Sequence, residues 1–281
     1  MEIEIDYTKS SQKNAEQYFD EAKELEAKSK GAEKTIARLN EEIEELEKAK
    51  IIEKKLVQNR KTEWYEKFYW FFTSNGMLAI GGRSAQQNEE IVSKYFEPKD
   101  MFFHADVFGA SAVILKKGIE ALGTVKAEVA QFAACYSKAW ESGQASVDVF
   151  AAKQEQVSKS SSKGALGTGG FLIRGDRLWF RHMNLELYAF SSAQEINLQG
   201  NIEDNAIINP LPVKIEVNAN KISIIPKLTF ANANISNAIK LTPGDKKKSD
   251  TAKLLSEKLG FEDVDYIMQH LPPGGFSVAF R

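Results

Sequence analysis

The N-terminal part of the chain carries apolar or small residues in alternating steps of three and four, with no proline between them. This spacing is the heptad seam of a coiled coil. It predicts one long helix from about Gln12 to about Phe68, and a coiled-coil arm over residues 1–63. The seam consists of Ala15, Tyr18, Ala22, Leu25, Ser29, Ala32, Ile36, Leu39, Ile43 and Leu46. After Leu46 the phase of the pattern slips, as a local insertion would cause.

A heptad seam needs a second helix to cover it, because a lone helix cannot bury its own apolar stripe. The rest of the chain contains no other segment of matching length and pattern. We therefore expect the partner arm to come from another copy, from another polypeptide, or from a part of the gene that this chain lacks.

Beyond the helix, short apolar runs alternate with turn residues, which is typical of strands. Asn75–Gly76 predicts a hairpin, because Asn-Gly favours tight turns. A second strand pair is expected around Phe108-Gly109-Ala110, and a later hairpin is expected to turn on Gly175-Asp176. The predicted strands cover 68–74, 77–82, 101–107, 111–117, 146–152, both arms of 171–182, and 185–190.

Helical spacing returns in several shorter segments, and the signal weakens into a polar connection from about Ser191 to Asn209. The predicted short helices cover 84–96, 125–143, 244–261 and 264–271, and a further hairpin is expected over 213–226. The fold class is therefore α+β: a long coiled-coil helix, then a mixed, mainly antiparallel sheet domain with packed helices. We expect a sheet domain over 64–190 and a C-terminal α+β extension, 191–281, packed on it.

Composition narrows the class of protein. The chain has 281 residues, of which 43% are hydrophobic and 27% are charged, which is typical of globular proteins. No apolar run approaches the length of a membrane span, and the N-terminus lacks a signal peptide. A single cysteine, Cys135, excludes an internal disulfide framework and suits a reducing compartment. We expect a soluble, cytoplasmic protein without a membrane partner.

The charge is unevenly distributed although the formal net charge is only −2. Glutamate dominates part of the N-terminal helix, whereas later stretches such as "LKKG", "SKSSSKG", "IRGDRLWFRH" and "GDKKKSD" are basic. A site for a polyanion would therefore be a patch on one part of the molecule.

Catalytic and metal chemistry have little support in the sequence. The histidines His104, His182 and His270 are far apart, so we expect no metal site and no cofactor. Asp106 lies two residues from His104 and could hold a metal or a proton relay, but it more simply orients a neutral histidine. Cys135 falls on the apolar face of a predicted helix, which favours a packed thiol over a nucleophile. We expect no enzymatic activity.

Contacts with a polyanion are better supported. Gly81 and Gly82 would let a backbone approach a ligand, and Arg83 could bind a phosphate with two hydrogen bonds. The other candidates are Gln86, Gln87, Asn88, Lys159, Lys163, Arg174, Arg177, Arg181 and Lys246 to Lys248, with Trp179 and Phe180 available for packing or base stacking. Each lysine run alone is more simply a solvated face, so the argument depends on Gly-Gly-Arg and the amides that follow it.

These residues carry a resemblance to the RNA-binding module of the NFACT family. The similar motifs occur in family order from about Trp64 to Arg181: "WYEKFYWFFTSNGMLAIGGRSAQQNEEIV", "FHADVFGASAVILK", "VAQFAACYSKAW", "QEQVSKS" and "GGFLIRG". The tail "TPGDKKKSDTAKLLSEKL" with "LPPGG" resembles the C-terminal extension of archaeal members. "IDYTKSSQKNAEQYFDEAKE" resembles the start of the family's second coiled-coil arm.

The resemblance implies a role in ribosome quality control. Such proteins bind large ribosomal subunits that still carry a nascent chain on a transfer RNA, and they help to extend that chain without a template. The family's N-terminal domain, helix-hairpin-helix region and first arm are absent here, so this chain should not support tailing alone. Phe108 stands where many relatives have a second histidine, and Ser84 stands where relatives often have Asp.

The resemblance and the residues together give our main hypothesis, an RNA-binding component that contacts transfer RNA or ribosomal RNA. An N-terminal NFACT half, in a separate chain or a missing segment, would supply the other arm. The candidate RNA-binding residues are Arg83, Gln87, Asn88, His104, Asp106, Lys116, Lys117, Lys159, Lys163, Arg174 and Arg177. The alternatives are a structural tether whose coiled coil binds a protein without RNA contact, and an enzyme that uses Cys135 or His104.

Overall fold

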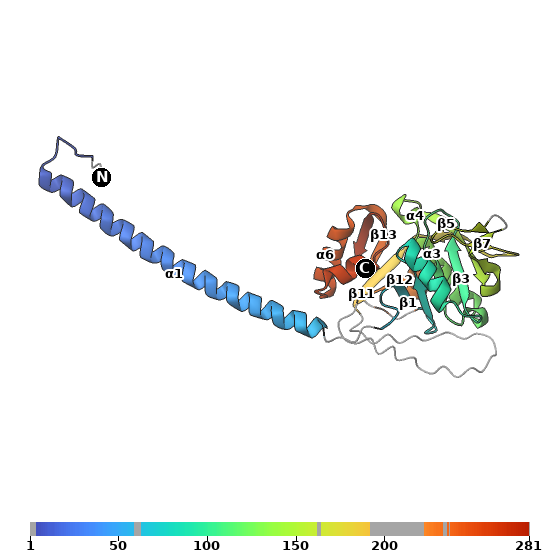
Figure 1. The fold of residues 1–281 in the computed structure, drawn as a ribbon. Helices are drawn as coiled ribbons and strands as arrows, with labels where there is room; N and C mark the ends of the chain where they lie inside the picture. The colour runs from blue at the N-terminus through green and yellow to red at the C-terminus, as the bar shows by residue number, and fades with distance from the viewer. Residues whose placement is uncertain are drawn as a thin grey trace. The chain divides into compact units, whose positions relative to one another are not determined.

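The structure is a computed structural model that describes residues 4–58, 63–161, 164–191, 222–232, 235 and 237–280. The chain divides into two compact units, Met1–Thr62 and Glu63–Arg281. The fold is α+β, as the sequence predicts, with a long N-terminal helix followed by mainly antiparallel sheets and several helices (Figure 1). The further boundary expected at residue 190 stays a prediction.

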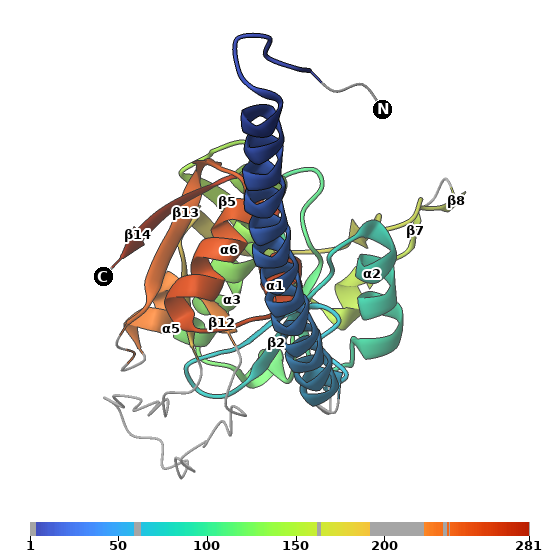
Figure 2. The ribbon, with the colours of Figure 1, turned by 90° about the vertical axis from the view of Figure 1, so that its left-hand side faces the viewer.

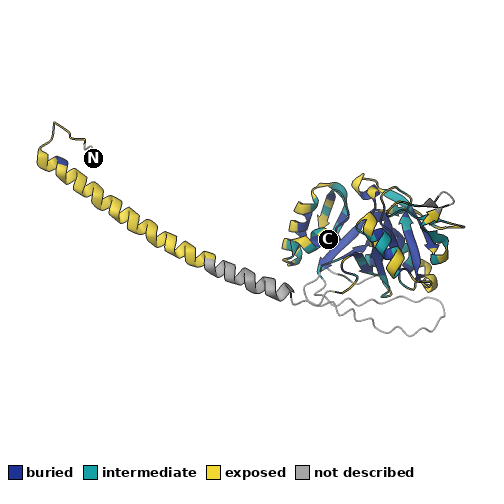
Figure 3. Cartoon of the chain, in the orientation of Figure 1, coloured by how far each residue is buried: buried dark blue, intermediate teal, exposed yellow. Residues whose placement is uncertain are grey.

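The first unit is formed by helix α1 (Ser11–Gln58). Figure 3 colours α1 as exposed along almost the whole of the part whose burial is described. The seam residues Leu25, Ile36 and Ile43 are 60%, 58% and 53% exposed. The predicted continuation of the helix to Phe68 is wrong, because residues 64–67 form a turn. Within the described ranges, no helix has the length and apolar character needed to cross a membrane.

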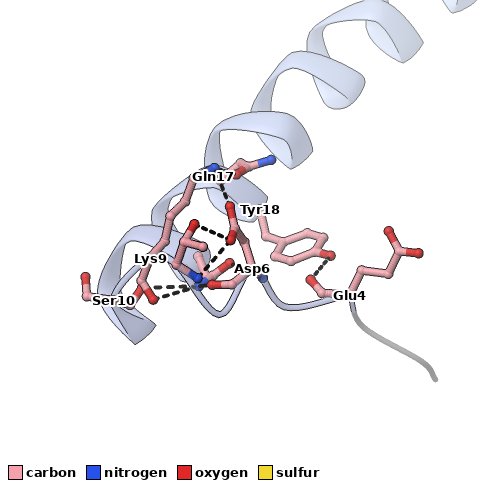
Figure 4. Close-up of polar contacts among 8 residues, drawn as sticks. Glu4, Asp6, Lys9, Ser10, Gln17 and Tyr18 are labelled. Carbon is pink, nitrogen blue, oxygen red and sulfur yellow. Dashed lines mark hydrogen bonds and ion pairs between the residues drawn. The ribbon is translucent and has the colours of Figure 1, made fainter.

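The start of α1 is closed by side-chain hydrogen bonds (Figure 4). The Asn14 side chain accepts a hydrogen bond from the Asp6 N–H at 3.0 Å and donates one to the Asp6 carbonyl at 3.0 Å. The Tyr18 hydroxyl donates to the Glu4 carbonyl at 2.6 Å. These bonds satisfy backbone groups of Glu4 and Asp6, in the segment before α1. The segment before α1 is thereby held against the first helical turns.

The second unit is built on a six-stranded antiparallel sheet with the order β1-β2-β4-β3-β5-β10. Its strands are β1 (Tyr69–Phe72), β2 (Leu78–Gly81), β3 (Met101–Ala105), β4 (Val113–Leu115), β5 (Ser146–Lys153) and β10 (Leu178–Asn184). The predicted pairing of β1 with β2 through Asn75–Gly76 is confirmed. The predicted pairing of β3 with β4 is also confirmed.

Alternate side chains of this sheet enter two separate cores, because successive residues of a strand point to opposite faces. Phe71, Phe103 and Val149 belong to the larger core, which includes helix α3 (Gly123–Cys135). Phe102 and Phe150 belong to the smaller core on the opposite face. The π-helical turn η1 (Ile91–Tyr95), which continues helix α2 (Ala85–Glu90), contributes Ile91, Val92 and Tyr95 to this smaller core.

A second sheet, with the order β12-β11-β13-β14, shares the larger core. Its strands are β11 (Leu187–Ser191), β12 (Ile222–Pro226), β13 (Ile239–Lys246) and β14 (Phe276–Phe280). They are accompanied by helices α5 (Lys227–Ala231), α6 (Lys248–Leu259) and α7 (Val264–His270), and Figure 2 shows α6 beside β13 and β14. The C-terminal residues are therefore part of one continuous apolar core rather than a separate globule.

Several sequence predictions need correction. The predicted 171–182 hairpin is wrong, because β9 (Leu172–Ile173) pairs with β6 (Val157–Ser158) while β10 pairs with β5. The predicted helix 125–143 is broken at Tyr136, and α4 (Lys138–Glu141) begins anew with Ser137 as its N-cap. Strand β12 of the predicted 213–226 hairpin pairs with β11. The other arm of that hairpin and the 192–209 connection lie outside the described residues.

The remaining elements are short. A hairpin of β7 (Ser160–Ser161) and β8 (Gly164–Ala165) projects from the body of the domain in both ribbon views (Figures 1 and 2). Two 3-10 turns, η2 (Gly118–Glu120) and η3 (Gln154–Gln156), follow β4 and β5.

Candidate nucleic-acid interface

Aromatic side chains from three neighbouring strands line one end of the smaller-core face. In the strand register, Phe150 of β5 is paired with His104 of β3 on one side and with Trp179 of β10 on the other. Paired residues of an antiparallel sheet share a face. The ring centroids of His104 and Phe150 are 5.7 Å apart, and those of Phe150 and Trp179 are also 5.7 Å apart. The sheet thus arranges three rings in a row that runs to its β10 edge.

Two further rings extend this row, and we call the five together the ring cluster. Phe102 lies parallel to His104, with 6.1 Å between the centroids and 6° between the planes. Phe171 contacts Phe102 edge-on at 5.9 Å. The ring cluster therefore consists of Phe102, His104, Phe150, Phe171 and Trp179.

Two exposed arginines lie over rings of the cluster. The Arg177 guanidinium carbon is 4.6 Å from the centroid of Phe150, and that of Arg181 is 4.1 Å from the centroid of Trp179. Cations prefer such positions because the face of an aromatic ring is electron-rich. Each arginine therefore presents a planar, charged surface to solvent above a largely buried ring.

Arg181 is held by a carboxylate and by the shape of β10. Its Nη1 is 2.6 Å from Asp148, and the His182 backbone N–H donates to the same carboxylate at 2.8 Å. The His182 hydrogen bond and then the Arg181 hydrogen bond lower the pKa of Asp148. The strand register shifts between Phe180 and Met183, and His182 has a φ of +54°. A bulge of this kind re-aims the neighbouring side chains, and here it contains Arg181 and His182.

Lys159 joins the same surface from the loop side. Its Nζ lies 5.4 Å from the centroid of Phe171 and 3.0 Å from the Glu89 carboxylate of α2. Of the sequence-predicted RNA-binding residues, Lys159, His104 and Arg177 are therefore brought together by the ring cluster. Lys163 lies outside the described residues.

His104 contributes an aromatic ring to the ring cluster rather than a positive charge. Burial lowers the pKa of its imidazole below the ordinary value near 6.5, although Asp106 partly opposes this shift. Asp106 is exposed, and no hydrogen bond joins its carboxylate to His104 within the part of the chain that the structure describes. Burial therefore favours the neutral form of His104, and the charge of Asp106 acts against this.

Arg83 points into the protein rather than to solvent. Its Nη2 donates to the carbonyls of Glu66 at 3.0 Å and Phe68 at 2.8 Å, and its Nη1 donates to Gln269 at 3.1 Å. Burial lowers the pKa of this guanidinium. Arg83 thus ties the turn before β1 to helix α7.

The charge of Arg83 also acts on the C-terminal elements. Burial, and then Arg83, lower the pKa of Lys248 to about 8 and that of His270 to about 4. The Lys248 Nζ donates to the Leu271 carbonyl at 2.8 Å. Of the lysines at 246–248, this one therefore supports the fold instead of facing solvent.

The amides after Gly-Gly-Arg hold their own loop together. Gln87 accepts from the Arg83 N–H at 3.0 Å and donates to the Lys67 carbonyl at 3.1 Å. Asn88 is buried, accepts from the Ala112 N–H at 2.9 Å, and donates to the Ala110 carbonyl at 3.3 Å. The side chains that the sequence assigned to RNA thus have partners inside the domain.

The remaining predicted residues lie apart from the ring cluster or at its border. Lys116 is 2.6 Å from the fully buried Asp100 and 3.0 Å from Glu97, so it neutralises a buried charge. Lys117 is exposed, and its backbone has a φ of +55°. Arg174 is exposed next to β9, where its N–H donates to the Gln156 carbonyl at 2.8 Å.

Sequence reasoning missed Phe102, Phe150 and Phe171, because each of them belongs to a run that reads as ordinary core. For Phe102 and Phe150 the available signal was their position on the same strand face as His104 and Trp179. Reading that signal requires the pairing of β3, β5 and β10, which local pattern does not give.

A sheet face that presents aromatic rings and arginine planes is typical of RNA-binding domains. The comparisons agree with this class: residues 67–175 match the family model described as "NFACT protein RNA binding domain". The chain belongs to the NFACT family, and the domain in question is an RNA-binding one.

The curated relatives are ribosome quality control proteins. The chain is 34% identical over 232 residues to the archaeal Rqc2 homolog aRqcH of Methanocaldococcus jannaschii, covering 81% of this chain and 31% of that protein. It is 36% identical over 186 residues to the ribosome quality control complex subunit NEMF homolog of Drosophila melanogaster, covering 62% and 18%. It is 34% identical to human NEMF, covering 58% and 16%. The chain spans a third or less of the length of these relatives.

Proposed function

We propose that the chain is an RNA-binding component of a cytoplasmic ribosome quality-control factor, acting on large ribosomal subunits that carry a nascent chain on a stalled transfer RNA. The observation that carries the proposal is a set of three cations placed over rings of an RNA-binding domain: the exposed Arg177 and Arg181 and the half-buried Lys159. Cations of this kind neutralise phosphates, and the rings beneath them add contact area.

The geometry revises which residues meet the RNA. We assign contacts to Lys159, Arg174, Arg177 and Arg181, which surround or adjoin the ring cluster. Arg83 and Lys116 have intramolecular partners at hydrogen-bonding distance and act on RNA indirectly, by holding the domain in shape.

The proposed role is not enzymatic. Burial raises the pKa of the Cys135 thiol above its ordinary value, which disfavours the thiolate needed for nucleophilic attack. His104 lies among the rings of the sheet face, and burial lowers its pKa. The role of both groups in this proposal is structural.

Removing the three clustered cations tests the proposal. We expect Lys159→Ala/Arg177→Ala/Arg181→Ala to weaken binding to transfer RNA and to isolated large subunits by about tenfold or more at physiological salt, because each lost phosphate contact reduces the counterion release that drives binding. The dependence of log K on log salt should fall by about 0.7–0.9 for each phosphate contact removed. Fluorescence anisotropy across a salt series measures both quantities.

The matched control removes the same number of charges elsewhere. Lys99→Ala/Lys253→Ala/Lys258→Ala changes exposed lysines outside the ring cluster and should leave the affinity within about twofold, since charges beyond a Debye length are screened. Equal losses in the two triple variants would overturn the assignment. Absence of salt-sensitive binding in the unchanged chain would favour the tether hypothesis.

The exposed seam of α1 supports a partner for the arm. Leu25, Ile36 and Ile43 are 60%, 58% and 53% exposed, which is costly for apolar side chains aligned on one helix. We propose that an NFACT N-terminal half supplies a helix that covers this seam.

Charged substitutions in the seam test the pairing. Leu25→Glu/Ile36→Glu should abolish co-purification of this chain with a polypeptide that carries the other arm, because the pair would bury two unpaired carboxylates. Ala27→Glu/Ala37→Glu adds the same charges at outer heptad positions and should leave co-purification intact. Retention of the partner by both variants would refute the seam as the contact.

A further inference from the structure

The surface of the ring cluster carries a guanidinium group over an aromatic ring at two neighbouring places, and we call each of these pairs a layer. Arg177 lies 4.6 Å over Phe150, and Arg181 lies 4.1 Å over Trp179. Phe150 and Trp179 are paired across adjacent strands, so the two layers are neighbours in the sheet. Both arginine side chains are exposed on their outer side.

An arginine over a ring can stack with a flat ligand, whereas a lysine in the same position cannot. A guanidinium is planar and weakly hydrated, so it stacks on a ring, whereas an ammonium is a strongly hydrated point charge. Nucleobases stack on aromatic side chains and on arginine planes when they are unpaired and splayed out. The bases of a duplex already stack on each other and cannot enter these positions.

We propose that Arg177 over Phe150 and Arg181 over Trp179 bind unpaired nucleobases by stacking, so that this face selects single-stranded segments of RNA over duplex. This inference rests on the proposed RNA-binding function and narrows its substrate class. A base can stack on the outer plane of the guanidinium, or displace it and stack on the ring below.

The neighbouring charges also act on a bound strand. Asp148 holds Arg181 at 2.6 Å and leaves a carboxylate beside the Trp179 layer, which repels phosphate there. Lys159 lies on the Phe171 side of the ring cluster, although Glu89 partly neutralises it. Arg174 is exposed in the segment between Phe171 and Arg177. In this arrangement the bases of a bound strand face Arg177 and Arg181, whose charges still attract its phosphates, and Lys159 and Arg174 add further phosphate contacts.

The test separates planarity from charge. In the full chain, the double substitution Arg177→Lys/Arg181→Lys keeps both positive charges but removes both planar guanidinium groups. We expect its affinity for an unstructured single-stranded oligoribonucleotide to fall by about tenfold, the effect of losing one to two stacked bases. Its affinity for a blunt duplex of the same length should stay within about twofold, because the phosphate contacts remain.

A second pair of variants separates loss of stacking from loss of folding. Trp179→Phe keeps a ring and should retain single-strand binding, whereas Trp179→Ala should lose it, and circular dichroism melts establish that both are folded at the assay temperature. If the double lysine variant binds single strands as tightly as the unchanged chain does, the stacking inference fails while the proposed function stands. If the unchanged chain binds neither single strand nor duplex, the proposed function fails as well.

Discussion

Replacing Glu128 with alanine is expected to lower the free energy of unfolding by about 4 kcal/mol, since several buried hydrogen-bond donors would lose their acceptor. Glu128 lies on α3 and is fully buried. Its carboxylate accepts from the Ser74 N–H at 2.8 Å, from the Ser74 hydroxyl, from Thr229 at 3.0 Å and from Asn232 at 3.1 Å. One side chain therefore joins the β1–β2 turn, α3 and the end of α5.

Two matched variants make the Glu128 measurement specific. Glu128→Gln keeps the shape but turns one acceptor into a donor, so we expect a smaller loss of about 1–2 kcal/mol. Glu120→Ala removes an exposed carboxylate and should change the stability by less than about 0.5 kcal/mol. Urea unfolding followed by circular dichroism measures all three. If Glu128→Ala lowered the free energy of unfolding by less than about 1 kcal/mol, the carboxylate would not be holding these three elements together.

Gly82→Ala is expected to cost about 3 kcal/mol of stability through overpacking. A Cβ at this position would lie 2.2 Å from the Asn88 side-chain oxygen and 2.7 Å from the Asn88 backbone nitrogen. The side chain of Asn88 is held by Ala110 and Ala112, so it cannot move away cheaply. The same unfolding experiment measures the effect.

The control for Gly82 is Gly123, the first residue of α3, where a Cβ would meet no atom within 4 Å. Gly123→Ala should be neutral or stabilising by up to about 1 kcal/mol, because alanine favours helix. The pair also separates two roles for Gly82. If Gly82 served only the approach of a ligand, Gly82→Ala would reduce RNA binding and leave the stability unchanged.

Local sequence pattern predicted those parts of the fold whose partners are close in the chain. Alternation and Asn75–Gly76 gave β1 and β2, and the glycine after Phe108 marked the turn between β3 and β4. The pattern failed where pairing is distant. The Pro243-Gly244-Asp245 sequence reads as a turn, yet it lies within β13, where the register against β14 shifts between Pro243 and Lys246. A bulge uses turn residues without ending the strand.

The sequence predicts which residue types form the candidate site, but it does not predict which side chains point to solvent and which point into the domain. The sequence assigned Arg83, Gln87 and Asn88 to RNA because they are polar residues outside any ordinary surface pattern. Their hydrogen bonds to the turn before β1, to the β3–β4 loop and to α7 depend on tertiary packing, which one sequence does not reveal. Arg177 and Trp179 were predictable as site residues because basic and aromatic residues alternate in this segment. In a strand, alternate residues share a face, so the pattern also describes the folded sheet.

The position of β10 has a consequence for the solubility of the domain. β10 is the last strand of the six-stranded sheet, and it begins after residue 175, where the match to the RNA-binding family model ends. Without it, β5 would offer a row of unpaired backbone N–H and C=O groups to any passing chain. β10 itself resists such self-pairing, because it carries a bulge and exposed Arg181 and His182. Arg181, which contacts RNA in our proposal, thus also helps to prevent aggregation at the β10 edge of the sheet.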